Sequence, residues 1–278
     1  MLVNLETILK SARTDGYAVG LFNTTDTDLL QAVIAAAEAK KSPVIIGTAE
    51  ILLPYADFDA IGASMIHMAK KASVPVTVHF DHGLTFDRCM QALKMGFSGI
   101  MFDGSALSYD ENVRQTREIV KNAHSFGASV EGEIGHVGEA ANGDNAAEDM
   151  YTTVSEARAY AAATGVDALA VAIGTAHGAY KHQPKLDFER LTDIRAALDI
   201  PLVLHGGSGL SDDDFRNSIK CGISKVNIFT DLCNAAQSAV QSAFARGEAY
   251  LGANFAKKRE VQSAVERKME LFGSVGRA

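Results

Sequence analysis

The sequence predicts a single α/β domain folded as a (β/α)8 barrel, also called a TIM barrel. Eight short and continuously apolar runs are spaced evenly along the 278 residues, and stretches of helical periodicity separate them. Continuously apolar runs are typical of parallel strands that are covered on both faces. Eight such units with right-handed crossovers close naturally into a barrel. The runs are residues 18–22, 43–47, 76–80, 99–103, 129–135, 168–174, 202–207 and 225–229.

Helical stretches alternate with these runs. Residues 28–40 carry aliphatic side chains at helical spacing, and residues 110–126 begin with Asp110 at the expected N-cap. An open, doubly wound sheet is the alternative, but it rarely needs so many evenly spaced strands. A helix from about residue 232 follows the last run, and a charged amphipathic tail at residues 255–272 would pack under the barrel or onto a partner subunit. Because no linker interrupts the chain, residues 1–278 are expected to form one domain.

The composition indicates an ordinary globular protein that binds neither nucleic acid nor a membrane. Hydrophobic residues make up 47% and charged residues 22% of the chain, and the formal net charge is −8. This charge disfavours a nucleic-acid backbone or an anionic membrane surface as partner. The three cysteines show no CxxC spacing, and neither a signal peptide nor a membrane-spanning apolar run is visible. We therefore expect a cytoplasmic protein.

One connection is unusually long. Residues 136–155, after the fifth run, are mainly small and acidic and show no apolar periodicity. Long loops inside compact domains are commonly lids or binding loops, and this one leaves the end of the barrel where such folds carry their active sites. A solvated surface loop is the alternative, and we favour the lid.

Three histidines stand at the ends of three different runs. His82, His177 and His205 are each followed by a glycine. The C-terminal ends of barrel strands meet at one mouth, where three neutral imidazoles would form an open Zn²⁺ site with one position free for water or substrate. The other histidines are interpreted as structural, with His79 inside the barrel.

Carboxylates accompany these histidines. Asp81 directly precedes His82, so it could exchange a proton with a bound substrate or, alternatively, orient a ligating imidazole. Asp103 and Glu133 lie in the fourth and fifth runs. They could support the histidines, bind a second cation, or serve a structural role.

Two loops predict a phosphate site. Residues 205–209 follow the seventh run and are rich in glycine, and residues 227–231 follow the eighth. The loops after these two strands, with helix N-termini behind them, are the recurrent phosphate site of this fold. Ser208 and Thr230 would add hydroxyl donors to the backbone N–H groups.

Together these groups predict Lewis-acid chemistry on a phosphorylated carbonyl compound. A metal would polarise a ketone and stabilise an enediolate, while carboxylates move protons. A Schiff base is disfavoured, because no lysine stands at the C-terminal end of a run: Lys181 falls in a loop and Lys225 begins the eighth run.

The same residues resemble the class II, zinc-dependent ketose-bisphosphate aldolases, which include fructose-bisphosphate and tagatose-bisphosphate aldolases. The matching stretches occur in family order and cover nearly the whole chain: residues 22–23, 79–83, 131–135, 172–180, 205–209 and 227–231. The resemblance implies a homodimer or homotetramer that reversibly cleaves a ketose (bis)phosphate into dihydroxyacetone phosphate and an aldehyde.

The resemblance also implies roles for individual residues. Asp81 is the proton donor and acceptor at the C4 hydroxyl of the substrate, and the three histidines bind the catalytic Zn²⁺. Asp103 and Glu133 match positions that can hold a second divalent ion, and a monovalent cation, Na⁺ or K⁺, is sometimes held near Gly178. The residues that match the binding site for the substrate are Asn23, Gly178, Gly206, Gly207, Ser208, Asn227, Ile228, Phe229 and Thr230.

The departures from the family pattern concern the lid and the aldehyde half. The lid lacks a Gly-Gly-x-Glu-Asp-like run, so Glu139 is the candidate for the second catalytic carboxylate, with Glu148 as the alternative. No Asp-Pro-Arg-like segment precedes the tail, and Glu50 stands where many relatives carry a small polar residue facing the substrate. A ketose monophosphate, or another sugar without the distal phosphate, is therefore an alternative substrate.

Two more distant functions remain as alternatives. A zinc-dependent barrel hydrolase would carry a His-x-His pair on the first strand, whereas the first run here ends in Phe22 and Asn23. A non-catalytic sugar-phosphate-binding subunit would not need to keep Asp81 together with three histidines.

Overall fold

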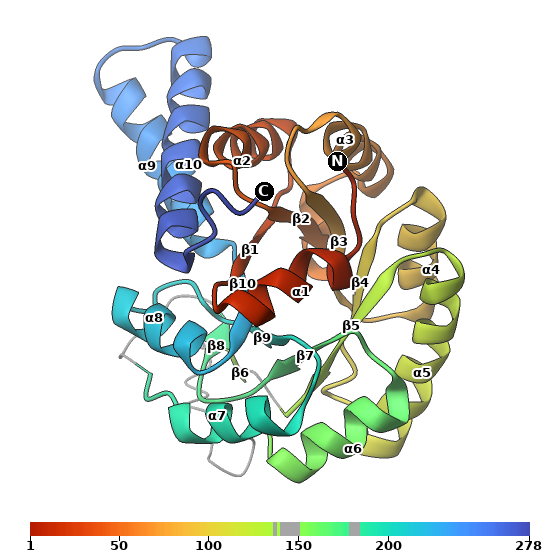
Figure 1. Cartoon of the computed structure of the whole chain (residues 1–278). Coiled ribbons are helices and arrows are strands. Elements are labelled where there is room, and N and C mark those ends of the chain that lie inside the picture. Colours follow the sequence, from red (N-terminus) through yellow and green to blue (C-terminus); the bar gives the residue numbers. More distant parts are fainter. Residues whose placement is uncertain (136–137, 140–150, 178–183) are drawn as a thin grey trace.

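The computed structural model describes residues 1–135, 138–139, 151–177 and 184–278. Its centre is a closed parallel barrel of eight strands in the order β1-β10-β9-β7-β5-β4-β3-β2, surrounded by helices (Figure 1). The barrel strands are β1 (Val19–Asn23), β2 (Val44–Ala49), β3 (Val76–Gly83), β4 (Gly99–Phe102), β5 (Ser129–Ile134), β7 (Ala168–Val171), β9 (Leu202–Leu204) and β10 (Ile223–Ile228). Each corresponds to one predicted apolar run, and the predicted (β/α)8 barrel is confirmed.

The helices form the outer layer. They are α2 (Thr27–Lys40), α3 (Phe58–Lys71), α4 (Phe86–Met95), α5 (Tyr109–Ser125), α6 (Val154–Thr164), α7 (Phe188–Ala197), α8 (Asp212–Lys220) and α9 (Thr230–Ala245). The predicted N-cap of α5 was wrong by two residues. The Ser108 hydroxyl accepts from the Glu111 N–H, and Asp110 lies in the first turn, where its charge still favours the helix N-terminus.

A helix that the sequence analysis did not identify, α1 (Leu5–Asp15), closes the N-terminal end of the barrel. Figure 1 shows it lying across the centre of the ring of strands. Its buried residues pack against side chains from the lower half of the barrel interior. This cluster comprises Leu5, Ile8, Leu9, Ala12, Tyr17, Val19, Leu21, Ile45, Ala168, Ala170 and Val203. Because this end is filled by apolar side chains, polar chemistry is confined to the opposite end.

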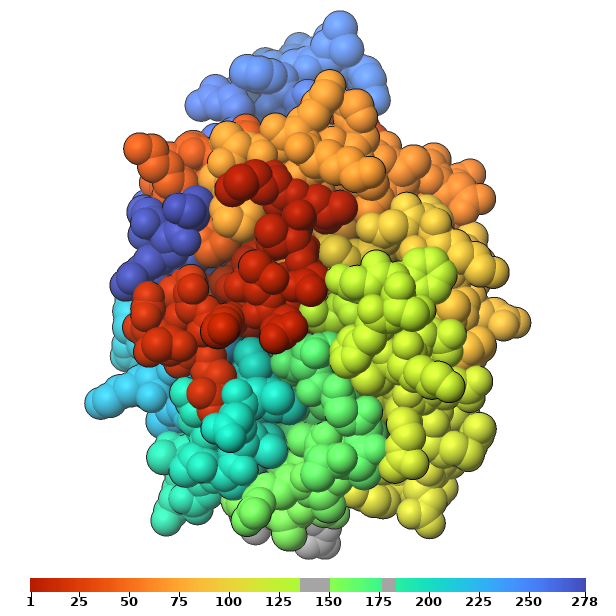
Figure 2. Space-filling model, turned by 45° about the vertical axis from the view of Figure 1, so that its right-hand side comes forward, coloured from red at the N-terminus to blue at the C-terminus, as the bar shows by residue number. Residues whose placement is uncertain are grey.

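The C-terminal tail is a helix, α10 (Tyr250–Phe272), which begins earlier than the predicted residue 255. It buries Val261, Val265 and Met269 and lies beside α2 and α9 (Figure 1). The α9–α10 hairpin projects beyond the barrel, as the light-blue protrusion in Figure 2 shows. The tail thus packs against its own barrel, and the homo-oligomer stays a prediction.

Two short strands outside the barrel connect the lid region to the loop after β7. Strand β6 (Gly138–Glu139) pairs with β8 (Ala176–His177), with Glu139 opposite His177. The rest of the predicted lid up to residue 150, including Glu148, lies outside the described residues. Among the described residues, no helix is long and apolar enough to cross a membrane. The cytoplasmic location stays a prediction.

Candidate active site

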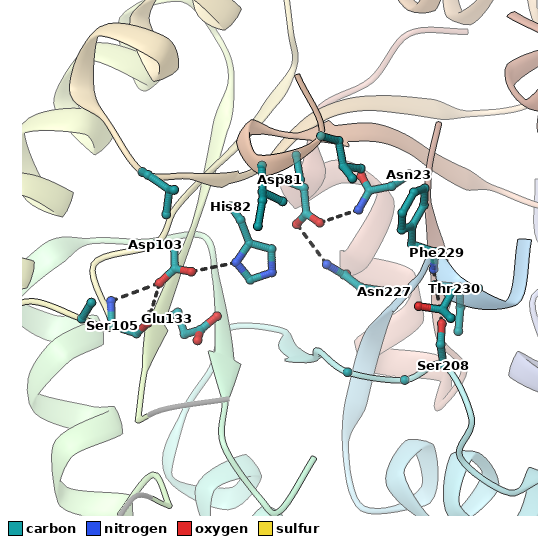
Figure 3. Close-up of a pocket in the computed structure, with 18 residues that line it drawn as sticks. Asn23, Asp81, His82, Asp103, Ser105, Glu133, Ser208, Asn227, Phe229 and Thr230 are labelled. Carbon is teal, nitrogen blue, oxygen red and sulfur yellow. Dashed lines mark hydrogen bonds and ion pairs between the residues drawn. The ribbon is translucent and has the colours of Figure 1, made fainter. Parts of the chain in front are cut away.

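A cavity of about 420 Å³ opens at the C-terminal ends of the barrel strands. Figure 3 shows His82 between Asp103 and Asp81, with Ser208 and Thr230 on the far side of the cavity. Most of the residues predicted for the site reach this cavity. They are Asn23, Asp81, His82, Asp103, Glu133, Gly206, Gly207, Ser208, Asn227, Ile228, Phe229 and Thr230.

Both Asp81 and His82 line this cavity although they are consecutive on one strand. Successive side chains of a regular strand point to opposite faces, so one of the two would normally face away. The register of β3 against β4 shifts between Phe80 and Gly83, where β3 has one residue more than β4 between paired positions. His82 also adopts a left-handed φ of 43°. This β-bulge redirects His82 into the mouth beside Asp81.

Asp81 is held by two amide groups. Asn23 Nδ2 donates to Oδ2 at 2.7 Å, and Asn227 Nδ2 donates to Oδ1 at 3.0 Å. Burial alone would raise the pKa of this carboxyl, but the nearby positive charges of His82 and Lys225 outweigh it and hold the pKa below its usual value. Asp81 is therefore ionised and oriented, as a proton acceptor must be.

His82 and His205 each bind a carboxylate through one ring nitrogen. His82 Nδ1 lies 2.8 Å from Asp103 Oδ2, and His205 Nε2 lies 2.8 Å from Glu131 Oε1. Because a carboxylate accepts hydrogen bonds, the N–H of each ring lies at His82 Nδ1 and at His205 Nε2. The other ring nitrogens, His82 Nε2 and His205 Nδ1, then direct their lone pairs inward. Ser105 fixes Asp103 in turn, because its N–H and hydroxyl both donate to Asp103 Oδ1.

The two inward nitrogens, His205 Nδ1 and His82 Nε2, are only 2.8 Å apart. Two lone pairs facing each other require a proton or a cation between them. Accordingly, although burial lowers the pKa of His82, the charge of Asp81 and the hydrogen bond with Asp103 raise it to about 9. This donor arrangement fits a divalent metal, and Asp81, His82 and His205 present ligand atoms close enough to share one ion.

Glu133 completes a second group of possible ligands with His82 and Asp103. Burial and then the nearby charge of Asp103 raise the pKa of Glu133 to about 8. A carboxyl group held neutral by its surroundings would ionise beside a bound cation. This geometry agrees with the predicted second-cation position at Asp103 and Glu133.

The other end of the cavity offers backbone donors. Gly206 has a φ of 65°, and a Cβ atom at this position would overlap the backbone of Ala176. The N-terminus of α9 begins at Thr230 without a side-chain cap, so its first N–H groups are not used by a capping side chain. Phe229 N–H donates to Ser208 Oγ at 3.4 Å, which ties the two predicted phosphate loops together. This end can bind an anion.

Three predicted site residues are only partly described or lie outside the described residues. The backbones of Glu139 and His177 lie side by side in the small β6–β8 sheet, and their side chains are not among the described parts. Gly178 lies outside the described residues. The roles predicted for these three residues stay predictions.

Comparison with known proteins agrees with this geometry. The family described as "Fructose-bisphosphate aldolase class-II" matches residues 3–277. The chain belongs to this family. It is therefore an aldolase, a carbon–carbon lyase, and the resemblance predicted from the sequence is confirmed.

Several relatives resemble this class II aldolase along its whole length. A protein of Shouchella clausii named 6-phospho-5-dehydro-2-deoxy-D-gluconate aldolase is 39% identical, over 99% of this chain and 96% of that protein. The fructose-bisphosphate aldolase of Thermus caldophilus is 38% identical over 100% of both chains. The crystal structure of the YdjI aldolase of Escherichia coli K12 superimposes with a TM-score of 0.91, at 37% identity and with full coverage of both chains.

One side of the aldolase cavity is an aliphatic wall that was not predicted from the sequence. It is formed by Ala49, Ile51, Leu52, Leu84 and Ala106, which come from the ends of β2, β3 and β4. Ile51 and Leu84 are 64% and 54% exposed, so their side chains are available to a ligand. Short apolar segments just beyond strand ends carry no sequence signal of their own.

Glu50 adjoins this wall but does not face the cavity, contrary to the interpretation from the sequence. Its Oε2 accepts from the backbone N–H of Leu84 at 2.7 Å and of Thr85 at 3.2 Å, and its Oε1 accepts from the Thr85 hydroxyl at 3.1 Å. The carboxylate therefore fastens the turn after β3 to the 3-10 helix η1 (Glu50–Tyr55). Leu84, which this carboxylate holds, lines the cavity.

The buried contacts of Lys225 in the aldolase were not predicted from the sequence either. Lys225 lies inside β10 rather than at its start, and its side chain is fully buried. Its Nζ lies 2.7 Å from Glu131 Oε2 and donates to Asn227 Oδ1 at 2.7 Å. A lysine within a buried strand indicates a buried acidic partner, because an unpaired ammonium is too costly to bury.

Proposed function

We propose that this aldolase reversibly cleaves a ketose phosphate into dihydroxyacetone phosphate and an aldehyde, with Zn²⁺ as its metal. The observation that carries the proposal is the position of the Asp81 carboxylate, which is held by two amide groups close to the converging nitrogens of His82 and His205. A proton acceptor beside a metal site is what aldol cleavage requires at the carbon that becomes the aldehyde.

The anion-binding end would position the dihydroxyacetone phosphate half. Its phosphate would accept hydrogen bonds from the loop of Gly206, Gly207 and Ser208 and from the first turn of α9. Anchoring the phosphate there fixes the distance from the anchor to the reacting carbons. Binding energy from the non-reacting phosphate thereby orients the bond that breaks.

Asp81 would accept the proton of the C4 hydroxyl. As the O–H electron pair forms the carbonyl of the aldehyde, the C3–C4 bond breaks and its electrons remain on C3 of the dihydroxyacetone phosphate half. Asn23 supports this geometry: its Nδ2 orients Asp81, and its buried Oδ1 has no hydrogen-bond partner among the described residues. That oxygen is available to accept from a substrate hydroxyl.

Zn²⁺ bound by His82, His205 and, by family resemblance, His177 would supply Lewis acidity toward the substrate oxygens. Asp103 and Glu131 would keep the two supported imidazoles in the ligating tautomer. A proton must finally reach C3, and Glu139 is the residue we propose to deliver it. The pairing of its backbone with that of His177 supports this assignment.

The aliphatic wall favours a substrate whose aldehyde half carries no phosphate. Among the described residues that line the cavity, none is a lysine or an arginine that could bind a second phosphate. The relatives differ on this point, since one is named for a bisphosphate and another for a 6-phospho compound. The aliphatic wall therefore favours a ketose monophosphate as the substrate.

A substrate panel tests both levels of the proposal. Zinc-loaded protein would be incubated with dihydroxyacetone phosphate plus phosphorylated and unphosphorylated aldehydes, and with fructose and tagatose bisphosphates in the cleavage direction. We expect kcat/KM to be at least tenfold higher with unphosphorylated aldehydes than with phosphorylated aldehydes. Equal or faster turnover of a bisphosphate would refute the monophosphate assignment, and no turnover of any ketose phosphate would refute the ketose-phosphate cleavage itself.

A further inference from the structure

The buried ammonium of Lys225 connects the two halves of the catalytic machinery. On one side, Lys225 pairs with Glu131, whose other oxygen lies 2.8 Å from His205 Nε2. On the other side, Lys225 donates to Asn227, whose amide nitrogen donates to Asp81. One side chain thus contacts the support of a metal-binding histidine and the support of the proton acceptor.

The contact with Asn227 decides which way its amide faces. An amide presents an acceptor and a donor at nearly equivalent positions, so Asn227 could in principle turn either towards Asp81. Because Lys225 Nζ can only donate, it requires Asn227 Oδ1 on its own side. The Nδ2 group must then face Asp81 Oδ1, 3.0 Å away. The ammonium therefore selects the orientation in which Asn227 donates to Asp81.

The contact with Glu131 acts in the same way on the metal side. Lys225 Nζ lies 2.7 Å from Glu131 Oε2, and Glu131 Oε1 lies 2.8 Å from His205 Nε2, so the carboxylate is fixed between the ammonium and the imidazole. In this position Glu131 accepts from His205 Nε2, which leaves His205 Nδ1 directed at His82. All three members of this chain, Lys225, Glu131 and His205, have fully buried side chains, so solvent does not screen the interaction.

We propose that Lys225 is a positioning residue that sets the metal affinity through Glu131 and the rate of proton transfer through Asn227. The proposal rests on the proposed function, since it assigns a residue to that reaction. Metal affinity can be measured without turnover, so the effect of Lys225 through Glu131, here called the Glu131 branch, can be tested separately from the effect through Asn227, the Asn227 branch. The two branches diverge at the ammonium and can be separated by mutation.

The test compares Lys225→Met with the double variant Lys225→Met/Glu131→Gln. Lys225→Met keeps the length of the side chain but removes the ammonium that faces Glu131 Oε2 and Asn227 Oδ1. In the double variant no charge is left unpaired, and the amide oxygen introduced at position 131 can still accept from His205. Lys220→Met, an exposed lysine at the end of α8, is the matched control. Zinc affinity would be measured by chelator competition, the ligand field by the visible spectrum of the Co²⁺ form, and kcat and KM at saturating metal.

For Lys225→Met we expect zinc affinity to fall about 10- to 100-fold and kcat at saturating metal to fall at least tenfold, the range typical of groups that support metal ligands. The double variant should recover zinc affinity and the Co²⁺ spectrum to within about threefold while kcat stays low, since Asn227 remains without its donor. If Lys225→Met does not fold, the double variant alone decides the Asn227 branch through its kcat.

The inference is overturned if Lys225→Met retains wild-type zinc affinity and kcat, or if the double variant retains wild-type kcat. A loss that appears only in thermal stability, with kcat per zinc-loaded molecule unchanged, also overturns it. Failure of the proposed function looks different, because the wild-type protein would then be inactive in the same assay while the zinc-affinity differences remained.

Discussion

The lower and upper halves of the barrel interior are built on the same strands but have opposite character. On β1, the inward-facing Leu21 belongs to the apolar cluster under α1, and Asn23, two residues further on, hydrogen-bonds Asp81. On the chain through β9, Val203 belongs to the same cluster, and His205 follows it at the metal site. A step of two residues along a strand thus separates a contribution to stability from a contribution to chemistry.

The two halves also differ in what stabilises their buried side chains. The lower half gains from removing aliphatic surface from water and needs no partners. The upper half buries Glu131, Lys225 and Asp81, and each of these charges is stable only because a specific neighbour faces it. We expect mutations in the lower half to change the free energy of unfolding, and mutations in the upper half to change turnover.

Asp81→Ala should have the largest effect on turnover. Removing the proton acceptor should lower kcat by about 10²- to 10⁴-fold, the usual contribution of a positioned acid or base. Zinc bound per molecule, measured by atomic emission, should stay at the wild-type value because both imidazoles keep their supporting carboxylates. Turnover that survives this change would contradict the role assigned to Asp81.

Leu21→Ala and Asn23→Ala form a matched pair on one strand. Leu21 is fully buried, so its truncation should lower the free energy of unfolding by about 2–5 kcal/mol. Asn23→Ala should lower kcat about 100-fold, since Asp81 loses one of its two amide donors. Denaturant unfolding and steady-state kinetics on both proteins measure the contrast. Similar losses of kcat in the two variants would contradict the division into a lower half that affects stability and an upper half that affects turnover.

His79 allows a test of pH dependence at the boundary between the halves. Its ring is fully buried, with Asp81 and Glu131 oxygens 3.9 Å away. Burial, followed by the charge of Lys225, lowers its pKa to about 3. The folded protein therefore holds His79 neutral, while the unfolded chain takes up a proton below a pKa of about 6.5. Stability from this group is fully present above pH 6.5 and is lost as the pH falls toward 3.

The expected size is about 2 kcal/mol between pH 7 and pH 5. Urea unfolding of the metal-free protein at both pH values should show this loss, and His79→Gln should show a pH dependence smaller by that amount. Metal-free protein is used so that proton competition for the zinc ligands does not contribute. An unchanged pH dependence in the variant would mean that other groups account for the acid sensitivity.

Glu50→Ala should have the smallest effect. Losing a carboxylate that accepts from Leu84 and Thr85 releases the turn that carries part of the aliphatic wall. We expect KM for the aldehyde to rise about threefold and stability to fall by about 1–2 kcal/mol, with kcat within twofold of wild type. Glu118→Ala, which removes an exposed carboxylate from α5, is the control. A larger effect on kcat than on KM would place Glu50 in the chemistry instead.

The sequence alone predicted the barrel and most of the cavity residues, because both follow from local patterns. Continuously apolar runs mark strands that are covered on both faces, and polar residues at the ends of such runs meet at one mouth. The Lys225–Glu131 pair was not predictable in this way, because it joins β10 and β5 across the barrel interior. Helix α1 was missed as well, although Asn4 caps it and its buried face includes Leu5 and Leu9.

The β-bulge in β3 has a consequence for anyone who wishes to design such a site. An ideal barrel strand would aim either Asp81 or His82 at the substrate, and grafting the two side chains onto it would recover only half of the pair. The site therefore requires the extra residue between Phe80 and Gly83 and the left-handed backbone conformation of His82. A designer would have to transplant a piece of irregular backbone as well as a list of side chains.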